Sequence, residues 1–479
     1  MSLKQKAISG MIWNAVERFG STLFLFISNL VLARLLSPED FGAIGMLMVF
    51  IALSQAIIDG GFGAALIQKK EPTQADYSTI FFWNIGLSVV LYITLYFCAP
   101  AIASFYEMPT LVELLRVLGV ILILNALFLI QNNVLKKSIN FKKIAKVNLL
   151  AIVIGTILGI VAAFNGYGVW SLVIKTVSTS ILQCIIFWSY GKWRPKFIFC
   201  WGAFKSLFKF GCFMFLQSIA NSIYLNSLNL IIGKLFSSSS LGYFTQSRKL
   251  ADISRSTISS VVNNVTLPLF SELQDDKVIL KSHLREIIRG VAFLCFPLMA
   301  LIIVIAKPLI IMLLTTKWEA SIPLLQILCI HGAIFFMYEL SSNVLLAIGK
   351  SKLFFKIRVF QTIIGIILIL LGSLLGLNYV VWGYTLSAII IYGITALIIS
   401  KELNYRLIEQ FKDLYIFVIL SIISGFSAYM IKYLEVQLNC FTTIIIQLSI
   451  FILLYINLNL LLHKLNLNVL NFNNFHKIK

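Results

Sequence analysis

Apolar runs of helical length recur along the whole chain and determine its organisation. A helix that crosses a bilayer needs about 20 mostly apolar residues, and fourteen runs of roughly this length can be marked. The predicted spans are 10–36, 41–67, 77–101, 111–135, 144–164, 168–190, 207–236, 241–270, 287–305, 320–347, 354–376, 379–400, 412–432 and 440–462. The pattern predicts an all-α integral membrane protein with about 14 transmembrane helices.

The second, seventh and eighth runs are polar enough that a hydropathy window could miss them, but the distribution of charge supports counting them. Lys and Arg collect in every second gap between the runs. Of the 39 basic residues, 28 fall on the side that holds the N-terminus and six on the other side. Because cytoplasmic loops retain positive charge, we expect both termini of this multi-pass protein in the cytoplasm.

Composition excludes several classes of protein. Hydrophobic residues make up 59% of the chain and charged residues 12%, whereas soluble domains carry about 25% charged residues. The net charge of +20 lies in short gaps between apolar runs and forms no soluble basic face, so no nucleic-acid partner is expected. The seven Cys and four His do not cluster, so we expect neither a disulfide framework nor a metal site.

The chain also repeats itself. Residues 29–42 align without a gap with residues 229–242, and two shorter echoes follow in the same order. The period covers six spans, so both copies have the same orientation, as in parallel-repeat transporters. This arrangement predicts two six-helix lobes around a central cavity and two extra C-terminal helices. The expected domains are an N-lobe at 1–198 (spans 1–6), a C-lobe at 199–402 (spans 7–12), and spans 13 and 14 with a cytoplasmic tail at 403–479.

Charged residues inside the spans require an explanation, because Arg, Lys or Asp at a helix centre costs about 2.5–3.5 kcal/mol. The eighth span holds a polar stripe at spacings of three and four, formed by Arg248, Asp252, Arg255, Ser259 and Asn263. We interpret the stripe as the wall of a hydrated cavity, where Arg248 and Arg255 offer guanidinium groups to an anion. The alternative is a salt bridge of Asp252 that holds two helices together. One acid cannot neutralise two Arg, which favours the cavity.

The first and seventh spans carry polar residues that the repeat places in equivalent positions. Glu17 aligns with Gln217, and both would line the same cavity from the two lobes. A local pairing of Glu17 with Arg18 near the inner interface is an equal alternative. The candidates for cavity lining in these two spans are Asn14, Glu17, Gln217, Asn221 and Tyr224.

Three further spans contain isolated charges. Asp59 follows Gln55 by one helical turn and precedes a run of glycines that favours close helix packing or a bend. This Asp is a candidate site for a coupling ion, H+ or Na+, or else the counter-charge of Arg18. Lys175 and Glu339 are single charges in spans 6 and 10 and are further candidates for the cavity wall.

No catalytic constellation is present. The outer loops lack paired carboxylates beside a basic cluster, and no Gly-rich nucleotide loop occurs. We therefore expect a transporter that is not an enzyme, is not driven directly by ATP and needs no cofactor beyond a coupling ion.

Three motifs near the N-terminus resemble a known family. They are Gly10-x-x-Trp13, then Leu32-Ala-Arg-Leu-Leu-Ser-Pro-Glu-Asp-Phe-Gly42, then Asp59-x-Gly-x-x-x-Ala65-Leu-Ile-Gln68. Together they resemble Wzx-type flippases of the multidrug/oligosaccharidyl-lipid/polysaccharide superfamily, in the branch of lipopolysaccharide biosynthesis and colanic-acid-type exporters. The number of spans and the two-lobe repeat extend the resemblance over essentially the whole chain.

The resemblance implies a V-shaped pair of lobes in the bacterial inner membrane. It implies a monomer that moves undecaprenyl-pyrophosphate-linked oligosaccharide to the periplasmic leaflet by alternating access, for surface polysaccharide assembly together with polymerase and chain-length machinery. By depth and face, Arg18, Arg248 and Arg255 suit pyrophosphate binding, with Lys175 as a further cation. Spans 13 and 14 would form a groove for the polyprenyl tail. The alternatives are a cation-coupled multidrug exporter of the same superfamily and a membrane glycan polymerase or ligase.

Overall fold

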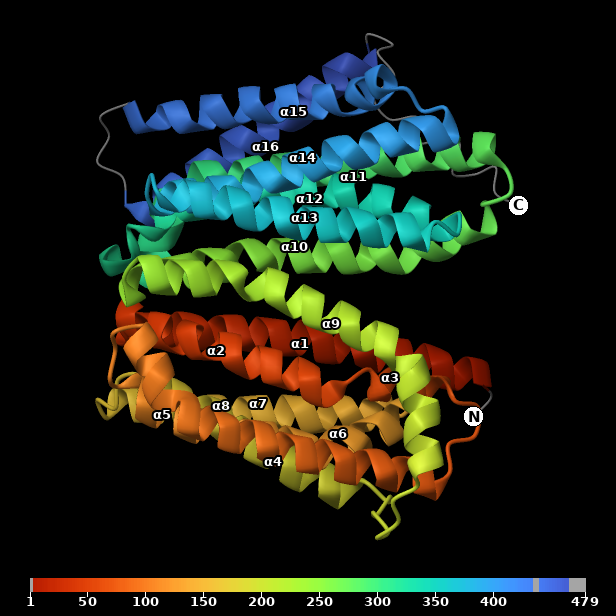
Figure 1. Ribbon diagram of the computed structural model, residues 1–479. Helices are drawn as coiled ribbons and strands as arrows, with labels where there is room; N and C mark the ends of the chain where they lie inside the picture. Colours follow the sequence, from red (N-terminus) through yellow and green to blue (C-terminus); the bar gives the residue numbers. More distant parts are fainter. Residues whose placement is uncertain (1–2, 434–438, 465–479) are drawn as a thin grey trace. The chain divides into compact units, whose positions relative to one another are not determined.

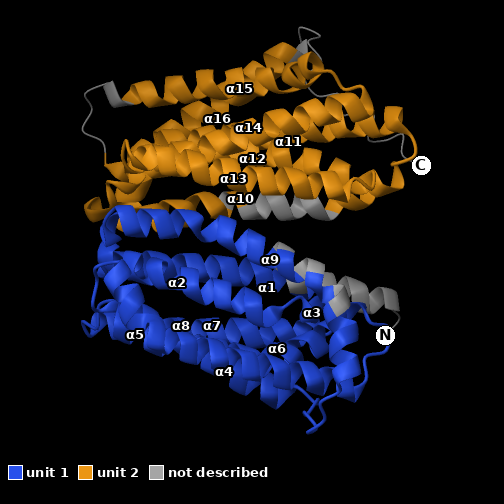
Figure 2. Cartoon of the chain, in the orientation of Figure 1, with its two compact units in different colours: residues 1–242 blue, residues 243–479 orange. Residues whose placement is uncertain are grey.

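The protein is a stack of long helices (Figure 1), seen here in a computed structural model that describes residues 3–433 and 439–464. Side chains are described for these residues apart from 3–11, 14, 15, 209, 210, 213, 214, 217, 254, 256–264, 432, 433, 463 and 464. Within this part of the chain no strand occurs. Contacts divide the chain into two compact units, residues 1–242 and residues 243–479 (Figure 2).

The first unit is built from nine α-helices in the described residues and the first turn of a tenth. They are α1 (Leu3–Leu35), α2 (Pro38–Asp59), α3 (Phe62–Gln68), α4 (Gln74–Phe105), α5 (Leu111–Leu118), α6 (Val120–Lys137), α7 (Phe141–Phe164), α8 (Trp170–Tyr190) and α9 (Trp201–Leu235). The second unit holds the rest of α10 (Ser238–Glu272), then α11 (Lys277–Leu314), α12 (Ser321–Ala347), α13 (Ser351–Ser373), α14 (Leu377–Leu403), α15 (Leu407–Tyr429) and α16 (Cys440–Lys464).

Each of the fourteen predicted spans coincides with helix. The second span is divided into α2 and α3, and the fourth into α5 and α6. Among the described residues, twelve segments are long and apolar enough to cross a membrane. The two spans outside this set are α9 and α10, each 35 residues long, which are the polar seventh and eighth runs. The prediction of an all-α, multi-pass membrane protein is confirmed.

The unit boundary falls after α9, because α9 packs on α2, α3 and α4 of the first unit. The domain boundary predicted at 198/199 follows the sequence repeat. A repeat reflects the common ancestry of two segments, whereas the division into compact units reflects packing. The domain limits drawn from the repeat stay a prediction.

The repeated segment has the same local structure in both copies. The α1–α2 turn is capped by Ser37, whose Oγ accepts from the Asp40 N–H at 3.2 Å. In the α9–α10 turn, Ser237 Oγ accepts from the Ser240 N–H at 3.1 Å. Such caps satisfy N–H groups that the first turn of a helix leaves unbonded. The alignment of the two segments therefore corresponds to a shared helix-start geometry.

The two repeated helix starts also pack on each other, through glycines within the first unit. A Cβ on Gly42 would lie 1.8 Å from the carbonyl oxygen of Ser238, and one on Gly242 would lie 1.9 Å from that of Pro38. These distances leave no room for a side chain, since the obstructing atoms belong to rigid helical backbone. The helix starts thus cross in a reciprocal backbone contact that only glycine permits.

We predict that Gly42→Ala and Gly242→Ala each lower the free energy of unfolding by about 1–3 kcal/mol, the usual cost of overpacking. Thermal unfolding of the purified protein in detergent micelles measures the loss. Gly86→Ala in α4 is the matched control, because nothing lies within 4 Å of its Cβ position and Ala favours helix. Equal melting temperatures for all three variants would contradict the crossing.

In the second unit, α15 is tied to α11 by an ion cluster around Asp413. Its fully buried carboxylate accepts from Arg285 Nε at 2.7 Å and Nη2 at 3.0 Å, and from Arg289 Nε at 2.8 Å. Tyr405 OH donates to the same group at 2.5 Å. Burial, followed by this hydrogen bond, raises the pKa of Tyr405 far above its usual value, so the phenol remains a donor. The partners satisfy both oxygens of a charge that burial alone would destabilise.

Asp413→Asn should destabilise the second unit by about 3–5 kcal/mol, the cost of removing one member of a buried ion cluster. Two guanidinium groups would then be left without their anion. Limited proteolysis between α14 and α15, compared with wild type, reports local release. Asp275→Asn, an exposed acid in the α10–α11 loop, should leave the cleavage rate unchanged.

Candidate functional site

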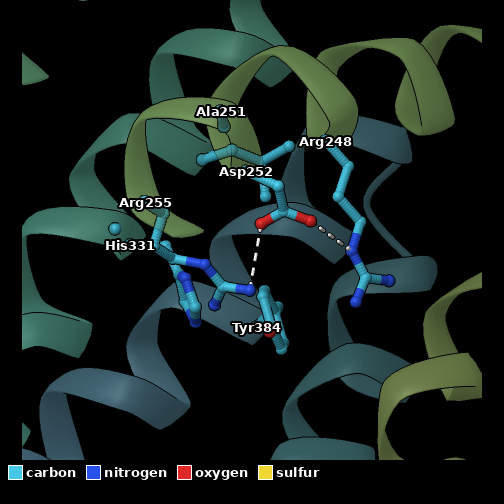
Figure 3. Close-up of a pocket in the computed structure, with 8 residues that line it drawn as sticks. Arg248, Ala251, Asp252, Arg255, His331 and Tyr384 are labelled. Carbon is cyan, nitrogen blue, oxygen red and sulfur yellow. Dashed lines mark ion pairs between the residues drawn. The ribbon is translucent and has the colours of Figure 1, made fainter. Parts of the chain in front are cut away.

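The most concentrated charge among the predicted site residues lies on α10. We call Arg248, Asp252 and Arg255 the α10 cluster. Arg255 Nη2 lies 3.0 Å from Asp252 Oδ1, and Arg248 Nε lies 3.6 Å from Asp252 Oδ2 (Figure 3). The Asp252 carboxylate thus lies between two guanidinium groups, one turn away on either side. One negative charge meets two positive charges, so the cluster keeps a net charge of +1.

Aromatic side chains from α12 and α14 complete the site. The guanidinium carbon of Arg255 lies 4.6 Å from the ring centre of Phe335, in cation–π contact. His331 stacks on Tyr384 with ring centres 4.2 Å apart. The Nε2 atom of His331 is buried and has no hydrogen-bond partner among the side chains that the structure describes. The α10 cluster therefore lies beside a group of aromatic rings, one of which contacts Arg255 directly.

The space enclosed by this site is small. The pocket between the α10 cluster, Leu328, His331 and Tyr384 measures about 10 Å³, close to the least that one water molecule needs. The Arg248 and Arg255 side chains are 21% and 22% exposed, and Asp252 is 39% exposed. The cluster is thus accessible from its surface, whereas the enclosed pocket itself is too small for a phosphate group.

The two interpretations of the stripe can now be compared with the geometry. The alternative required Asp252 to join two helices. Asp252 does pair with both Arg, but at spacings of four and three residues on α10 itself. The pairing therefore holds no second helix in place. Ser259 and Asn263, which continue the stripe, lie outside the residues whose side chains are described, and the predicted central cavity stays a prediction.

In the first unit, two predicted residues take part in polar contacts between helices. Asn148 of α7 donates to Glu17 Oε1 of α1, and Gln183 of α8 donates to Asn148 Oδ1 at 3.2 Å. Lys175 Nζ donates to Ser28 Oγ at 2.7 Å. These contacts connect α1 with α7 and α8. Within the described residues no carboxylate is paired with Lys175.

The remaining candidates are dispersed. Arg18 is exposed and forms no ion pair with Glu17 among the described residues, so the local pairing that was an equal alternative is not seen there. The reason is that adjacent helical residues do not face each other. Asn221 is exposed and Tyr224 is buried on α9, while Glu339 is half-buried on α12. The side chains of Asn14 and Gln217 lie outside the described residues. The structure therefore brings together only part of the predicted set.

Sequence reasoning missed several residues of these sites. Phe335 and Tyr384 are aromatic residues in apolar spans, and nothing in their spacing distinguishes them from lipid-facing positions. Asn148 and Gln183 could have been noticed, because each is an amide inside an apolar run, where an unbonded polar group is costly. Amides within spans are thus a usable signal, which applies to the fifth and sixth spans as it does to the first, seventh and eighth.

Comparison with known proteins gives a consistent set of relatives. A family profile described as polysaccharide biosynthesis protein matches residues 31–323. The teichuronic acid biosynthesis protein TuaB of Bacillus subtilis (strain 168) is 25% identical over 74% of each chain. The lipopolysaccharide biosynthesis protein WzxC of Escherichia coli (strain K12) is 24% identical over 81% of this chain and 80% of its own.

Solved structures of similar fold are membrane transporters. The lipid II flippase MurJ, in an inward closed conformation, superposes with a TM-score of 0.77 at 19% identity, covering 95% of this chain and 99% of its own. A multidrug resistance MATE transporter in the inward-facing conformation gives a TM-score of 0.62 at 18% identity, over 82% and 98%. At such identities the likeness establishes the fold alone.

Proposed function

This chain belongs to the polysaccharide biosynthesis protein family, and we propose that it is a flippase for a lipid-linked glycan. In this proposal it moves undecaprenyl-pyrophosphate-linked oligosaccharide across the inner membrane, from the cytoplasmic to the periplasmic leaflet. The observation that carries the proposal is the net positive α10 cluster within a membrane protein of this family. Support for a lipid-linked substrate comes from the lipid II flippase MurJ, which has the same fold.

The α10 cluster has the chemistry that a pyrophosphate requires. Guanidinium groups bind phosphate through two parallel hydrogen bonds, and two such groups about two turns apart on one helix can hold neighbouring phosphates. Asp252 occupies these donors while the site is empty, which avoids leaving two unpaired cations in the membrane. The incoming pyrophosphate displaces Asp252 and takes over its donors.

This exchange of anions keeps binding reversible. A site with two free Arg would bind pyrophosphate tightly and release it slowly, whereas transport needs release on the far side. Asp252 competes for the same guanidinium groups at 3.0 and 3.6 Å and so lowers the net affinity. In the proposed alternating-access cycle, the site opens first to the cytoplasm and then to the periplasm, while the polyprenyl tail remains in the bilayer.

Neutralising the cluster tests the proposal. Arg248→Gln and Arg255→Gln should each weaken binding of undecaprenyl pyrophosphate by about tenfold or more, because each removes charge-assisted hydrogen bonds of about 1.5–3 kcal/mol. Binding is measured with the purified variants in nanodiscs, and export by surface polysaccharide in a deletion strain of the host. Lys307→Gln is the control, since Lys307 is an exposed cation paired with Glu319 at 3.1 Å. Normal export by the double Arg variant would overturn this site.

Removing the competing acid should have the opposite effect on affinity. We expect Asp252→Asn to bind undecaprenyl pyrophosphate more tightly, by about tenfold, and to transport it more slowly. The measurement is the dissociation rate of the lipid from nanodiscs, together with export in the deletion strain. If Asp252→Asn instead weakened binding, Asp252 would be contacting the substrate or holding the fold, and the exchange of anions would be wrong.

A further inference from the structure

A cavity of about 870 Å³ lies at one end of the second unit, where three membrane helices meet. It is formed by the first turns of α11, the end of α14 and the start of α15. Its charged lining residues are three basic ones, Lys281, Lys401 and Arg406, and one acidic one, Glu409. The volume falls within the range of about 300–1,000 Å³ that is usual for ligand pockets.

One wall of the cavity is fixed by a compensated pair. Lys281 Nζ donates to Glu409 Oε2 at 2.8 Å and to the carbonyl oxygen of Asn404 at 2.7 Å. The same ammonium lies 5.6 Å from the ring centre of Tyr405, whose hydroxyl donates to the buried Asp413. The ion cluster around Asp413 therefore continues to the edge of the cavity and holds α11 and α15 together there.

The other two cations of the cavity are Lys401 and Arg406. Both are exposed, and neither forms an ion pair within the part of the chain that the structure describes. Glu402, the acid next to Lys401 in the chain, pairs with Lys350. Three basic residues and one acidic residue give the lining a net charge of +2. An ammonium and a guanidinium are thus available to bind a phosphate group.

A row of exposed apolar residues continues from the cavity along α15. Ile408, which lines the cavity, is 69% exposed, Phe411 is 69% exposed and Tyr415 is 38% exposed. Spacings of three and four residues place them on one face of the helix, and the rings of Phe411 and Tyr415 stack with centres 5.9 Å apart. Since α15 is long and apolar enough to cross a membrane, this face is suited to contact hydrocarbon.

We propose that the cavity binds the phosphate of an anionic glycerophospholipid, whose acyl chain lies along the exposed face of α15 that begins at Ile408. A soluble phosphate would use the cations alone, whereas a lipid uses both the cations and the apolar row. The distribution of charge along the chain predicts that this end of the helices is cytoplasmic. Basic pockets between membrane helices on that side bind anionic lipid head groups.

The bound lipid would join the ends of α11, α14 and α15 and so stabilise the second unit. This inference goes beyond the proposed function and does not depend on which lipid-linked glycan the protein moves. The cavity also shares no lining residue with the α10 cluster, so the two sites can be tested separately.

The test is thermal unfolding of the full-length protein in detergent, titrated with dioctanoyl phosphatidylglycerol. A ligand that binds only the folded state stabilises it according to its concentration and dissociation constant. We expect the lipid to raise the melting temperature of wild type. In the double variant Lys401→Gln/Arg406→Gln, the half-saturating concentration should rise by about tenfold or more, because two charges that attract the phosphate are removed. The double variant Lys352→Gln/Lys356→Gln, which removes two exposed cations of α13, is the matched control and should behave as wild type.

The apolar row is tested by a second pair of variants. Phe411→Ala should raise the half-saturating concentration severalfold, because the acyl chain loses apolar surface that it covers. Phe355→Ala is the matched control, since Phe355 is an aromatic residue of α13 that is 54% exposed. Equal responses of the two variants to the lipid would contradict the proposed course of the acyl chain.

Three other ligands distinguish the sources of the anion. Dioctanoyl phosphatidylcholine has the chains without net charge, and inorganic phosphate has the charge without chains. Neither should raise the melting temperature at concentrations where phosphatidylglycerol saturates, and stabilisation by either one to the same extent would overturn the proposal. So would a tighter response to undecaprenyl pyrophosphate that Lys401→Gln/Arg406→Gln abolishes, because the cavity would then serve the transported lipid.

The remaining outcomes are equally decisive. A wild-type protein that phosphatidylglycerol does not stabilise, or a Lys401→Gln/Arg406→Gln variant that responds at the wild-type concentration, would overturn the site. The melting temperatures without added lipid show whether each variant folds.

Discussion

Every charge inside hydrocarbon must be compensated, and this constraint separates the structural from the functional polar groups of the protein. Asp413 is fully compensated, since two guanidinium groups and a phenol surround its carboxylate. In the α10 cluster, one carboxylate pairs with two Arg side chains. Among the described residues, Lys175 has only the hydroxyl of Ser28 as a partner, and the carboxylate of Asp59 has no hydrogen bond or ion pair. The degree of compensation falls from a structural anchor to groups that can bind a charged ligand.

The same constraint acts on the backbone. Helices satisfy their own backbone N–H and C=O groups, which is why most chains that cross a lipid bilayer do so as helices. Contacts between helices then depend on how closely the backbones approach, and small residues set that distance. The reciprocal contact of Gly42 and Gly242 is the extreme case, because each glycine faces backbone atoms of the other helix start. Between α2 and α3, at Gly60 and Gly61, the helix is interrupted, so backbone groups there lose their helical partners. Asp59 is the last residue before this interruption.

Much of the fold could be predicted because its signals are local. Runs of apolar residues gave the fourteen helices, and the aligned segments gave two identical helix starts. The cluster at Asp413 could not be predicted, because Arg285 lies 128 residues away in the chain and no periodicity links the two. For the same reason, the stripe on α10 indicated which residues share a face, but not that Phe335, His331 and Tyr384 would enclose them. Asp59 was singled out by its sequence, whereas its proximity to Asn133 depends on packing between α2 and α6.

The α10 cluster has a net charge, and the membrane potential gives this charge a consequence for the proposed cycle. Moving one elementary charge across 100 mV is worth about 2.3 kcal/mol, and the inside of a bacterium is negative. A pyrophosphate with two negative charges bound to the +1 cluster gives a complex of charge −1, whose outward movement the potential favours. The empty carrier must then return. Counted in the same way, the empty α10 cluster carries +1, so the potential also favours its return inward. The net charge of the cluster would therefore make both halves of the proposed cycle favourable.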